Sequence, residues 1–361
     1  MTDVISLGIG EPDFVTPWHI RDAGIASLEK GQTYYTSNSG LIELRHEICT
    51  YMERRFDLSY APQNVLVTVG GSEAIDACIR ATVQSGDEVI IPEPCFVCYE
   101  PCVRLAGGIP VALVTTADNN FKLTAEALKE AITPKTKLLI LPYPNNPTGA
   151  IMTEKELKEI AKVLEDTEIL VLSDEIYAEL TYGTKHFSIA NIESMKERTV
   201  VIGGFSKCYA MTGWRLGYAL GDEIIIKAMT KIHQFAIMSA PTSSQYAAIE
   251  ALKNGDADIE YMAEKYDERR RYIIDRFNSI GLDCFEAQGA FYVFPCIKNT
   301  GMNSETFCKT LLEKKHVAVI PGNSFGESGE GFVRVSYAYS IEKIQKALDR
   351  IEEFLKEMGI N

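Results

Sequence analysis

The sequence predicts an α/β protein with a large domain built on a mostly parallel sheet covered by helices, and a smaller α+β domain. From Val65 to Leu220, short apolar runs alternate with amphipathic segments. Strands that are apolar on both faces are typical of a sheet with helices on both sides. From about Asp256 the pattern changes to one long, highly charged helix and then to mixed strands and helices.

In chain order, the first part should contain six strands, at 65–69, 88–91, 109–114, 137–141, 169–172 and 199–202. The helix predicted at 154–165 is preceded by Thr153, which stands at capping-box spacing from Glu156. The second part should contain a helix at 261–277, strands at 290–294, 317–320 and 332–337, and helices at 304–315 and 341–357.

No linker rich in proline, glycine or serine separates the two parts, so the long charged helix is expected to form the boundary. We predict a large domain at 15–255 and a small domain formed by 1–14 together with 256–361. The chain of 361 residues is long enough for about two domains with a large core.

Composition excludes several classes of function. The hydrophobic fraction of 46% and charged fraction of 24% are those of an ordinary globular protein. No apolar run approaches the roughly 20 residues of a membrane span, and the N-terminus has no signal-peptide pattern, so we expect a cytoplasmic protein without a membrane partner. A net charge of -14 would repel phosphate backbones, so nucleic acid is not an expected partner.

The nine cysteines are an odd number in a chain without a secretion signal, which favours reduced thiols over disulfides. Cys95, Cys98 and Cys102 have the close spacing of a metal site. A fourth ligand is not evident, and the five histidines are scattered without paired spacing. We therefore expect small buried thiols and no metal ion.

Lys207 stands in a mostly apolar stretch directly after the strand at 199–202, with Arg215 about two helical turns beyond it. Burial and a nearby cation both disfavour the charged form of a lysine, which makes its neutral amine available as a nucleophile toward a carbonyl. A single lysine in a strand-to-helix loop is usually without such a role. Only matching partners elsewhere in the chain would indicate a Schiff base.

Three polar motifs follow other predicted strands. Gly70, Gly71 and Ser72 join a strand to a helix, where backbone N–H groups and the helix N-terminus can bind phosphate. Asn146 lies between two prolines that restrict its backbone, although such residues are also common in plain turns. Asp174 follows a buried strand and needs a partner, which the protonated ring nitrogen of pyridoxal phosphate would supply.

With these motifs in one order and spacing, the chain resembles fold-type I pyridoxal-phosphate enzymes over nearly its whole length. Within them it is most similar to class I/II aminotransferases of the aspartate and aromatic type. The resemblance rests on the segments at 8–14, 35–40, 70–72, 145–149, 173–177, 206–207, 211–215 and 333–336. It implies a seven-stranded sheet in the large domain and pyridoxal 5′-phosphate as cofactor.

The resemblance also implies roles around the cofactor ring. Lys207 would form the Schiff base and then move the proton between the substrate Cα and the cofactor. Asp174 would pair with the ring nitrogen, while Asn146 and Tyr177 would bind the phenolic oxygen. Phe96 stands where relatives stack an aromatic side chain on the ring.

The phosphate would be bound by Gly71, Ser72 and Arg215. Many relatives add a serine three residues before the lysine, where this chain has Gly204. In relatives, the tyrosine that matches Tyr35 reaches the phosphate of the neighbouring subunit. The resemblance therefore implies a homodimer whose active sites are shared across the interface.

On the substrate side, the resemblance implies that Arg334 binds the α-carboxylate through its bidentate guanidinium, helped by Asn146 and the backbone of Gly10. The implied reaction is transamination of an L-amino acid with a 2-oxo acid, most simply 2-oxoglutarate, by a ping-pong mechanism. Aspartate enzymes near the type member of the family hold the distal carboxylate with an arginine in the segment matching 233–239, which contains none here. Other segments look most like a subgroup with aromatic and N-acetyl-diaminopimelate aminotransferases.

Three alternatives stay open at this point. A pyridoxal-phosphate-dependent β-lyase that cleaves C–S bonds would use the same lysine and the same carboxylate clamp. A non-catalytic pyridoxal-phosphate-binding regulator would be expected to carry a DNA-binding appendage, for which the chain has no spare residues. A dehydrogenase would need a dinucleotide fingerprint, which is absent from the sequence.

Overall fold

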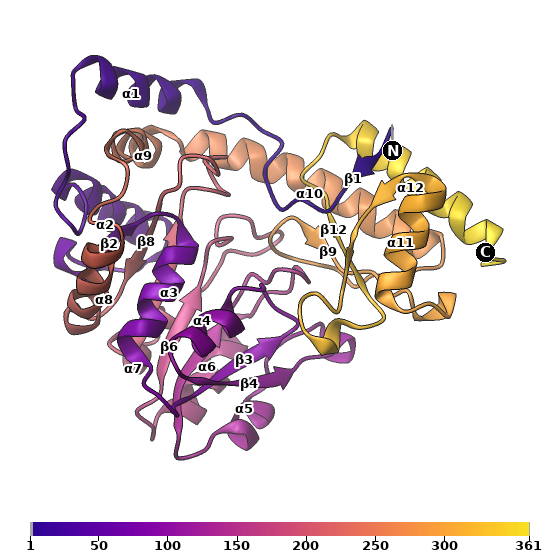
Figure 1. Cartoon of the computed structure of the whole chain (residues 1–361), viewed down its shortest axis with the longest axis horizontal. Helices are drawn as coiled ribbons and strands as arrows, with labels where there is room; N and C mark the ends of the chain where they lie inside the picture. The colour runs from indigo at the N-terminus through magenta and orange to yellow at the C-terminus, as the bar shows by residue number, and fades with distance from the viewer. Residues whose placement is uncertain (1–2, 361) are drawn as a thin grey trace.

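A seven-stranded sheet forms the centre of the computed structural model, which describes residues 3–360 (Figure 1). Its strand order is β2-β8-β7-β6-β5-β3-β4. The strands are β2 (Val65–Thr68), β3 (Glu88–Glu93), β4 (Ile109–Val114), β5 (Thr136–Leu141), β6 (Leu170–Asp174), β7 (Thr199–Gly204) and β8 (Gly217–Leu220).

The sheet is mostly parallel, as predicted. β4, β3, β5, β6 and β7 pair in parallel, whereas β8 runs antiparallel to both β7 and β2. All six strands expected from the sequence are present, and β8 completes the seven. The pattern did not single out β8, because it has only four residues directly after a loop and no apolar run of its own.

Helices cover both faces of the sheet. Alternate residues of a strand point to opposite sides, so the apolar strands present apolar side chains on both faces. In β5, Leu138 and Ile140 pack with the cluster that includes α3, α4 and α8, while Leu139 and Leu141 pack with α5 and α6. The bounds are α1 (Trp18–Glu29), α2 (Ile42–Phe56), α3 (Gly71–Thr82), α4 (Tyr99–Leu105), α5 (Ala125–Ala131), α6 (Glu154–Leu164), α7 (Glu193–Lys196), α8 (Glu223–Ala236) and α9 (Thr242–Asn254).

Two local expectations had different outcomes. The capping box at the start of α6 is present, since Thr153 and Glu156 bond each other's backbone N–H groups. The expectation that every strand is buried on both faces was wrong for β4. Ile109 is 45% exposed and Val114 is 59% exposed, because β4 lies at the edge of the sheet and has a neighbour on one side only.

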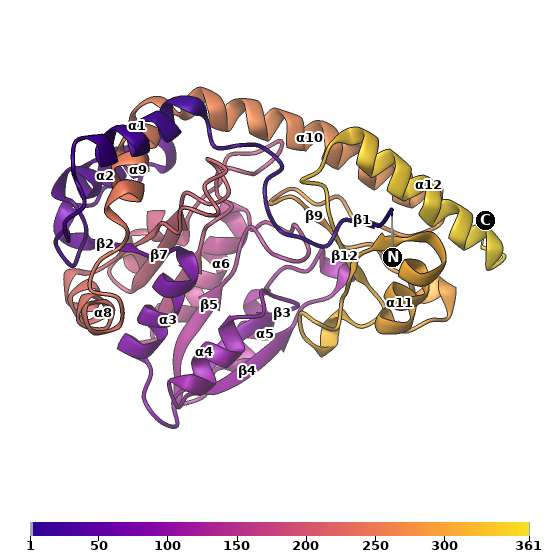
Figure 2. The same cartoon turned by 45° about the horizontal axis from the view of Figure 1, so that its top comes forward.

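The C-terminal part is built around the long helix α10, which runs from the helices beside the sheet to the small C-terminal core (Figure 2). Its observed bounds are wider than the predicted 261–277. The elements here are α10 (Asp256–Ser279), β9 (Tyr292–Val293), α11 (Ser304–Lys315), β10 (Val317–Ala318), β11 (Ile320–Pro321), β12 (Val333–Ser336) and α12 (Ile341–Glu357).

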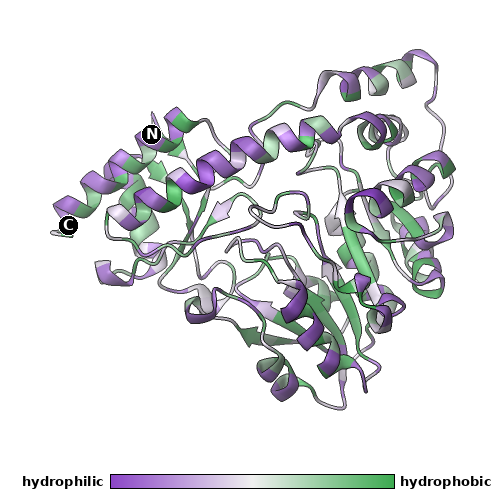
Figure 3. Ribbon diagram, turned by 180° about the vertical axis from the view of Figure 1, so that it is seen from behind, coloured by the Kyte–Doolittle hydropathy of each residue, from purple (hydrophilic) through white to green (hydrophobic). Residues whose placement is uncertain are grey.

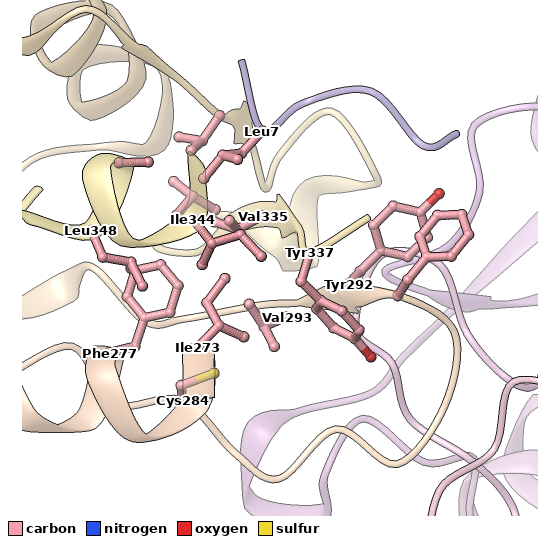
Figure 4. Close-up of a cluster of buried hydrophobic side chains, with 14 of the residues drawn as sticks. Leu7, Ile273, Phe277, Cys284, Tyr292, Val293, Val335, Tyr337, Ile344 and Leu348 are labelled. Atoms are coloured by element: carbon pink, nitrogen blue, oxygen red, sulfur yellow. The ribbon is translucent and has the colours of Figure 1, made fainter. Parts of the chain in front are cut away.

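The strand predicted at 317–320 is divided between two small sheets. β10 pairs in parallel with β1 (Ile5–Ser6), while β11 pairs antiparallel with β12 in a sheet that also contains β9. Pairing of β1 brings the N-terminal segment into the C-terminal core, where Leu7 lies close to Val335 and Ile344 (Figure 4). The exact domain bounds at 15–255 and 256–361 stay a prediction.

Hydropathy follows this layered arrangement. The central strands are apolar along their length, whereas α10 alternates polar and apolar residues and buries one face (Figure 3). Among residues 3–360, no helix is both long enough and apolar enough to span a membrane. Within the same range, no cluster of three metal-ligating side chains is found, and all nine cysteines are free thiols.

Candidate active site

A cavity of about 480 Å³ opens at the C-terminal ends of the central parallel strands. Asn146 follows β5, Asp174 ends β6 and Lys207 follows β7, and these three strands are neighbours in the sheet. Parallel strands bring their C-terminal ends to one edge, so residues far apart in the sequence converge there. Ten of the predicted site residues line this cavity, namely Gly10, Gly71, Ser72, Phe96, Asn146, Asp174, Tyr177, Lys207, Arg215 and Arg334.

Tyr35 is the predicted site residue that does not reach the cavity. Its side chain is 80% exposed in the segment between α1 and α2. A role for Tyr35 within its own chain is therefore not supported by its position.

The Lys207 amine is enclosed by the N-terminal segment and by aromatic rings. Its Nζ donates a hydrogen bond to the carbonyl of Gly10 at 2.6 Å and lies 5.6 Å from the centroid of Phe291. Burial lowers the pKa of Lys207 to about 8; the carboxylate of Glu11 opposes this shift and the guanidinium of Arg215 adds to it. An appreciable fraction of the amine is thus neutral near pH 8, as a nucleophile requires.

Asp174 is a buried carboxylate with one strong partner. The hydroxyl of Tyr99 donates to its Oδ2 at 2.6 Å, and the backbone N–H of Ile176 lies 3.3 Å from its Oδ1. Burial raises the pKa of Asp174, and the hydrogen bond from Tyr99 acts against that shift. Tyr99 remains a donor, because burial raises its own pKa well above the usual value. Oδ1 retains capacity for a cationic N–H in the cavity.

The turn before α3 is built for close backbone approach. Gly70 has a φ of 82°, and a Cβ at Gly217 of β8 would lie 2.6 Å from the carbonyl carbon of Gly70. Glycine is therefore required where β8 crosses the turn. α3 then begins at Gly71, so the unpaired N–H groups of its first turn and the Ser72 hydroxyl are available at the cavity.

Arg215 lies beside the same turn. Its Nη1 donates to the carbonyl of Thr212 at 2.8 Å, and its Nη2 would be 2.6 Å from a Cβ placed on Gly70. The helix N-terminus and this guanidinium thus present positive charge to one wall of the cavity. Such a wall favours an anionic group like phosphate.

Arg334 forms another wall, from β12. Its Nη1 donates to Asn146 Oδ1 at 2.9 Å and its Nη2 to the carbonyl of Gly8 at 2.6 Å. The guanidinium lies 4.6 Å from the ring centroid of Tyr292 and 4.7 Å from that of Phe325, while its Nε is buried without a partner. These contacts hold a planar cation in a fixed orientation, which suits a carboxylate.

Sequence reasoning missed several residues of the cavity. Tyr99 begins α4 three residues after Phe96, and its nearness in sequence to that predicted residue is the one local signal for it. Ser206 was visible as the neighbour of the lysine. Tyr292, whose hydroxyl lies 2.9 Å from that of Tyr177, has no local signal, because β9 brings it to the site through the tertiary fold.

The groups in the cavity fit pyridoxal phosphate by their chemistry. The cofactor has an aldehyde, a ring nitrogen and a phosphate, and the cavity offers an amine, a carboxylate and an anion-binding helix N-terminus with a guanidinium. The unpartnered Arg334 Nε leaves a cationic donor free for a further carboxylate. No part of this donor set conflicts with the cofactor.

Comparisons with known proteins identify the family of the chain. The family model for aminotransferase class I and II matches residues 2–351. The chain is 55% identical to "Putative aminotransferase YugH" of Bacillus subtilis over 98% of this chain and 92% of that protein. It is 46% identical to "Probable N-acetyl-LL-diaminopimelate aminotransferase" of the same organism, covering 98% of this chain and 89% of that protein.

A solved structure of an aromatic aminotransferase from Pyrococcus horikoshii OT3 superposes with a TM-score of 0.97 at 42% identity. The match covers 100% of this chain and 98% of that one. The predicted architecture and the predicted enzyme class are thereby confirmed. The chain belongs to the class I and II aminotransferase family, and it is a fold-type I aminotransferase that depends on pyridoxal 5′-phosphate.

Proposed function

We propose that this aminotransferase moves the amino group of an L-amino acid to 2-oxoglutarate in a ping-pong reaction that uses Lys207. The observation that carries the proposal is the position of two different cations in one cavity. Lys207 has a pKa of about 8 and can act as an amine, while the Arg334 guanidinium is oriented by Asn146 and Gly8. An amine for proton transfer and a carboxylate receptor are the two groups that transamination of an amino acid requires.

Roles around the cofactor follow from the chemistry of the lining residues. Bound pyridoxal phosphate supplies an electron sink that makes the substrate Cα–H acidic. Lys207 would anchor the cofactor through Nζ and then accept and return the Cα proton. Asp174 would hold the ring nitrogen in its protonated form through Oδ1, while Tyr99 keeps the carboxylate in place. Asn146 and Tyr177 would donate to the phenolic oxygen.

The remaining cofactor contacts are expected on two sides of the cavity. Gly71, Ser72 and Arg215 would bind the phosphate at the start of α3. Phe96 would stack on one face of the ring. Ser206 also lines the cavity beside the lysine and could donate to phosphate, which would offset the absence of a hydroxyl at Gly204.

The substrate carboxylate would bind at Arg334. In the present arrangement Gly8 accepts the bond from Nη2 and Nε has no acceptor. An incoming α-carboxylate can accept from Nε and from one Nη of the same guanidinium, which is the bidentate geometry of arginine. The amide of Asn146 and the backbone of Gly10 would add further polar contacts.

For the donor, we propose an amino acid of the aromatic or N-acetyl-diaminopimelate type. The relative with 46% identity and the solved neighbour carry those names. The segment 233–239 contains no arginine, and its side chains at Phe235, Ile237 and Met238 are exposed and apolar. That segment therefore offers no guanidinium for the distal carboxylate of aspartate.

We also propose a cytoplasmic homodimer in which Tyr35 contributes to the site of a second copy. Large apolar side chains are exposed on α1 and in the segment after it, including Trp18, Ile25, Leu28 and Tyr34. Exposure of so many large apolar groups in one region is typical of an interface. Sedimentation analysis of the purified protein should give the mass of a dimer, and a stable monomer with full activity would contradict this arrangement.

The function can be tested with a half-reaction screen. The holoenzyme is mixed with each amino acid in the absence of a 2-oxo acid, and the cofactor spectrum and the 2-oxo acid product are followed. A true donor should convert the cofactor to its amine form with one equivalent of product per site, and 2-oxoglutarate should restore the starting spectrum. Continuous release of pyruvate and ammonia from cysteine-type substrates would instead favour the β-lyase alternative.

A further inference from the structure

A second cavity, of about 580 Å³, shares Phe96 with the candidate active site but contains none of its charged groups. Its floor includes Pro110, Ala112 and Val114, which lie on one face of the edge strand β4 because strand residues alternate. α4 supplies one wall, and the loop at 323–328 supplies another. The exposure of β4 noted above thus belongs in part to a defined cavity.

Glu93 is the charged group that distinguishes this cavity. It ends β3, and within residues 3–360 its carboxylate makes no ion pair or hydrogen bond. Burial raises the pKa of Glu93, and the carboxylates of Glu100 and Glu327 act in the same direction. The nearby cation Arg104 is already paired with Glu100 at 2.7 Å. A half-buried carboxylate without a counter-ion is costly unless a partner arrives.

The loop at 323–328 is shaped around this carboxylate. Gly326 has a φ of 119°, and a Cβ there would lie 2.5 Å from Glu93 Oε2, so a side chain would displace the carboxylate. The loop is held in place by a hydrogen bond from the backbone N–H of Cys95 to the carbonyl of Phe325 at 2.9 Å. Glu93 is therefore contacted by backbone that supplies no positive charge.

The same loop contains two buried polar atoms without partners, Asn323 Oδ1 and Ser328 Oγ. Both residues line the cavity. Buried polar atoms are nearly always hydrogen-bonded, so the loop leaves part of its polar capacity unused. Glu93 lines the same cavity above a floor of apolar side chains, so a ligand there can meet both a carboxylate and an apolar surface.

We propose that this cavity binds a small organic cation, an ammonium group on an apolar body, with the ammonium paired to Glu93 and the body on the face of β4. An N–H of the ammonium satisfies the carboxylate, whose desolvation is then offset by an opposite charge. The apolar body removes the floor from water, which contributes about 25 cal/mol per Å² buried. The site is separate from amino transfer and needs neither Lys207 nor Arg334.

A tertiary ammonium is the appropriate probe, because it cannot form an imine with the cofactor aldehyde at Lys207. Titration calorimetry of the holoenzyme with N,N-dimethyl-2-phenylethylammonium should show saturable binding. The uncharged counterpart 2-methyl-4-phenylbutan-2-ol has nearly the same shape and should bind at least tenfold more weakly. Equal affinity for the two compounds, or no binding of the cation, would overturn the proposal.

Two variants locate the site. Glu93→Gln removes the charge and should weaken binding of the cation at least tenfold. Glu88→Gln makes the same change at the other end of β3, outside the cavity, and should leave the affinity unchanged. Ala112→Leu keeps the charge but fills part of the floor, and should also weaken binding tenfold or more. Wild-type affinity in either Glu93→Gln or Ala112→Leu, with folding confirmed by circular dichroism, would overturn the assignment.

Discussion

Two of the cations in the active-site cavity, Lys207 and Arg334, are affected by burial in opposite ways. On the β7 side, Lys207 is buried among apolar groups and near other cations, and its pKa falls to about 8. On the β12 side, Arg334 lies between the rings of Tyr292 and Phe325 and already donates to two acceptors. Burial makes a lysine reactive by making its neutral form accessible, whereas a guanidinium keeps its charge and gains orientation from the same burial.

Removing the amine of Lys207 should have the largest effect. Lys207→Ala should lower the rate of transamination by about 10⁴-fold or more, because it removes both the cofactor anchor and the proton carrier. Lys207→Arg is the matched control, since it keeps a cation but offers no amine, and it should be equally inactive. Single-turnover kinetics with a good donor are the measurement. Substantial activity in Lys207→Arg would show that a positive charge at position 207 is sufficient for transamination.

Replacing the other cation should have a smaller effect. Arg334→Gln removes the charge that receives the α-carboxylate, and loss of a buried charge pair costs about 2 to 5 kcal/mol. We therefore expect kcat/KM to fall by about 30-fold to about 4,000-fold, mostly through a higher KM. Arg334→Lys should recover only part of the loss, because an ammonium cannot make the bidentate contact.

The control for this prediction is Arg104→Gln, which changes the same side chain on the surface of α4 and should leave the kinetics unchanged. Equal kcat/KM in Arg334→Gln and wild type would mean that the α-carboxylate binds elsewhere.

The pH dependence of Lys207 tests whether burial activates its amine. With a pKa of about 8, roughly half of the amine is neutral at that pH, and well below it the neutral fraction falls about tenfold for each pH unit. The rate at which the apoenzyme captures pyridoxal phosphate covalently should therefore fall as pH drops from 9 to 6. Stopped-flow absorbance can follow the capture. A single inflection near the ordinary lysine value would show that burial does not activate this amine.

The smallest effect is expected from Tyr99, which acts through Asp174. In Tyr99→Phe the carboxylate loses a hydrogen bond that holds its pKa down, so it becomes protonated at a higher pH than in the wild type. Loss of one hydrogen bond to a charged group costs about 1.5 kcal/mol, so kcat should fall roughly tenfold. The acid limb of the pH profile should move to higher pH.

A purely structural role for Tyr99 would lower the melting temperature and leave that acid limb in place. The pH profile and the melting temperature of Tyr99→Phe should therefore be measured together.

The part of the site that sequence patterns could predict is the part that directly follows apolar strands. Asn146, Asp174 and Lys207 each follow an apolar run, and the topology of a parallel sheet brings such ends together. Arg334 and Gly10 were predicted through the family resemblance alone, since no local pattern distinguishes them. Their place in the cavity depends on pairing of β1 with β10 and of β12 with β9 and β11.

The rest depends on tertiary contacts that periodicity does not encode. Tyr292 reaches Tyr177 across 115 positions of sequence, because the segment before β9 pairs at Gly289 with Thr181 in the segment after β6. β8 forms a strand because it pairs with both β2 and β7, and its four residues alone have no strong strand pattern. Tyr35 was given its role by the family resemblance. In the single chain its side chain is exposed and does not line the cavity.

The crossing of β8 over the turn at Gly70 also has a consequence for mutational scanning. Any side chain at Gly217 would collide with the backbone at Gly70 and Gly71, so substitutions there should lower the amount of folded, active protein. Gly217 has no chemical group to contribute to catalysis. A screen scored by growth alone would therefore score Gly217 like Lys207. A parallel measurement of protein abundance would separate the loss of folded protein at Gly217 from the loss of catalysis at Lys207.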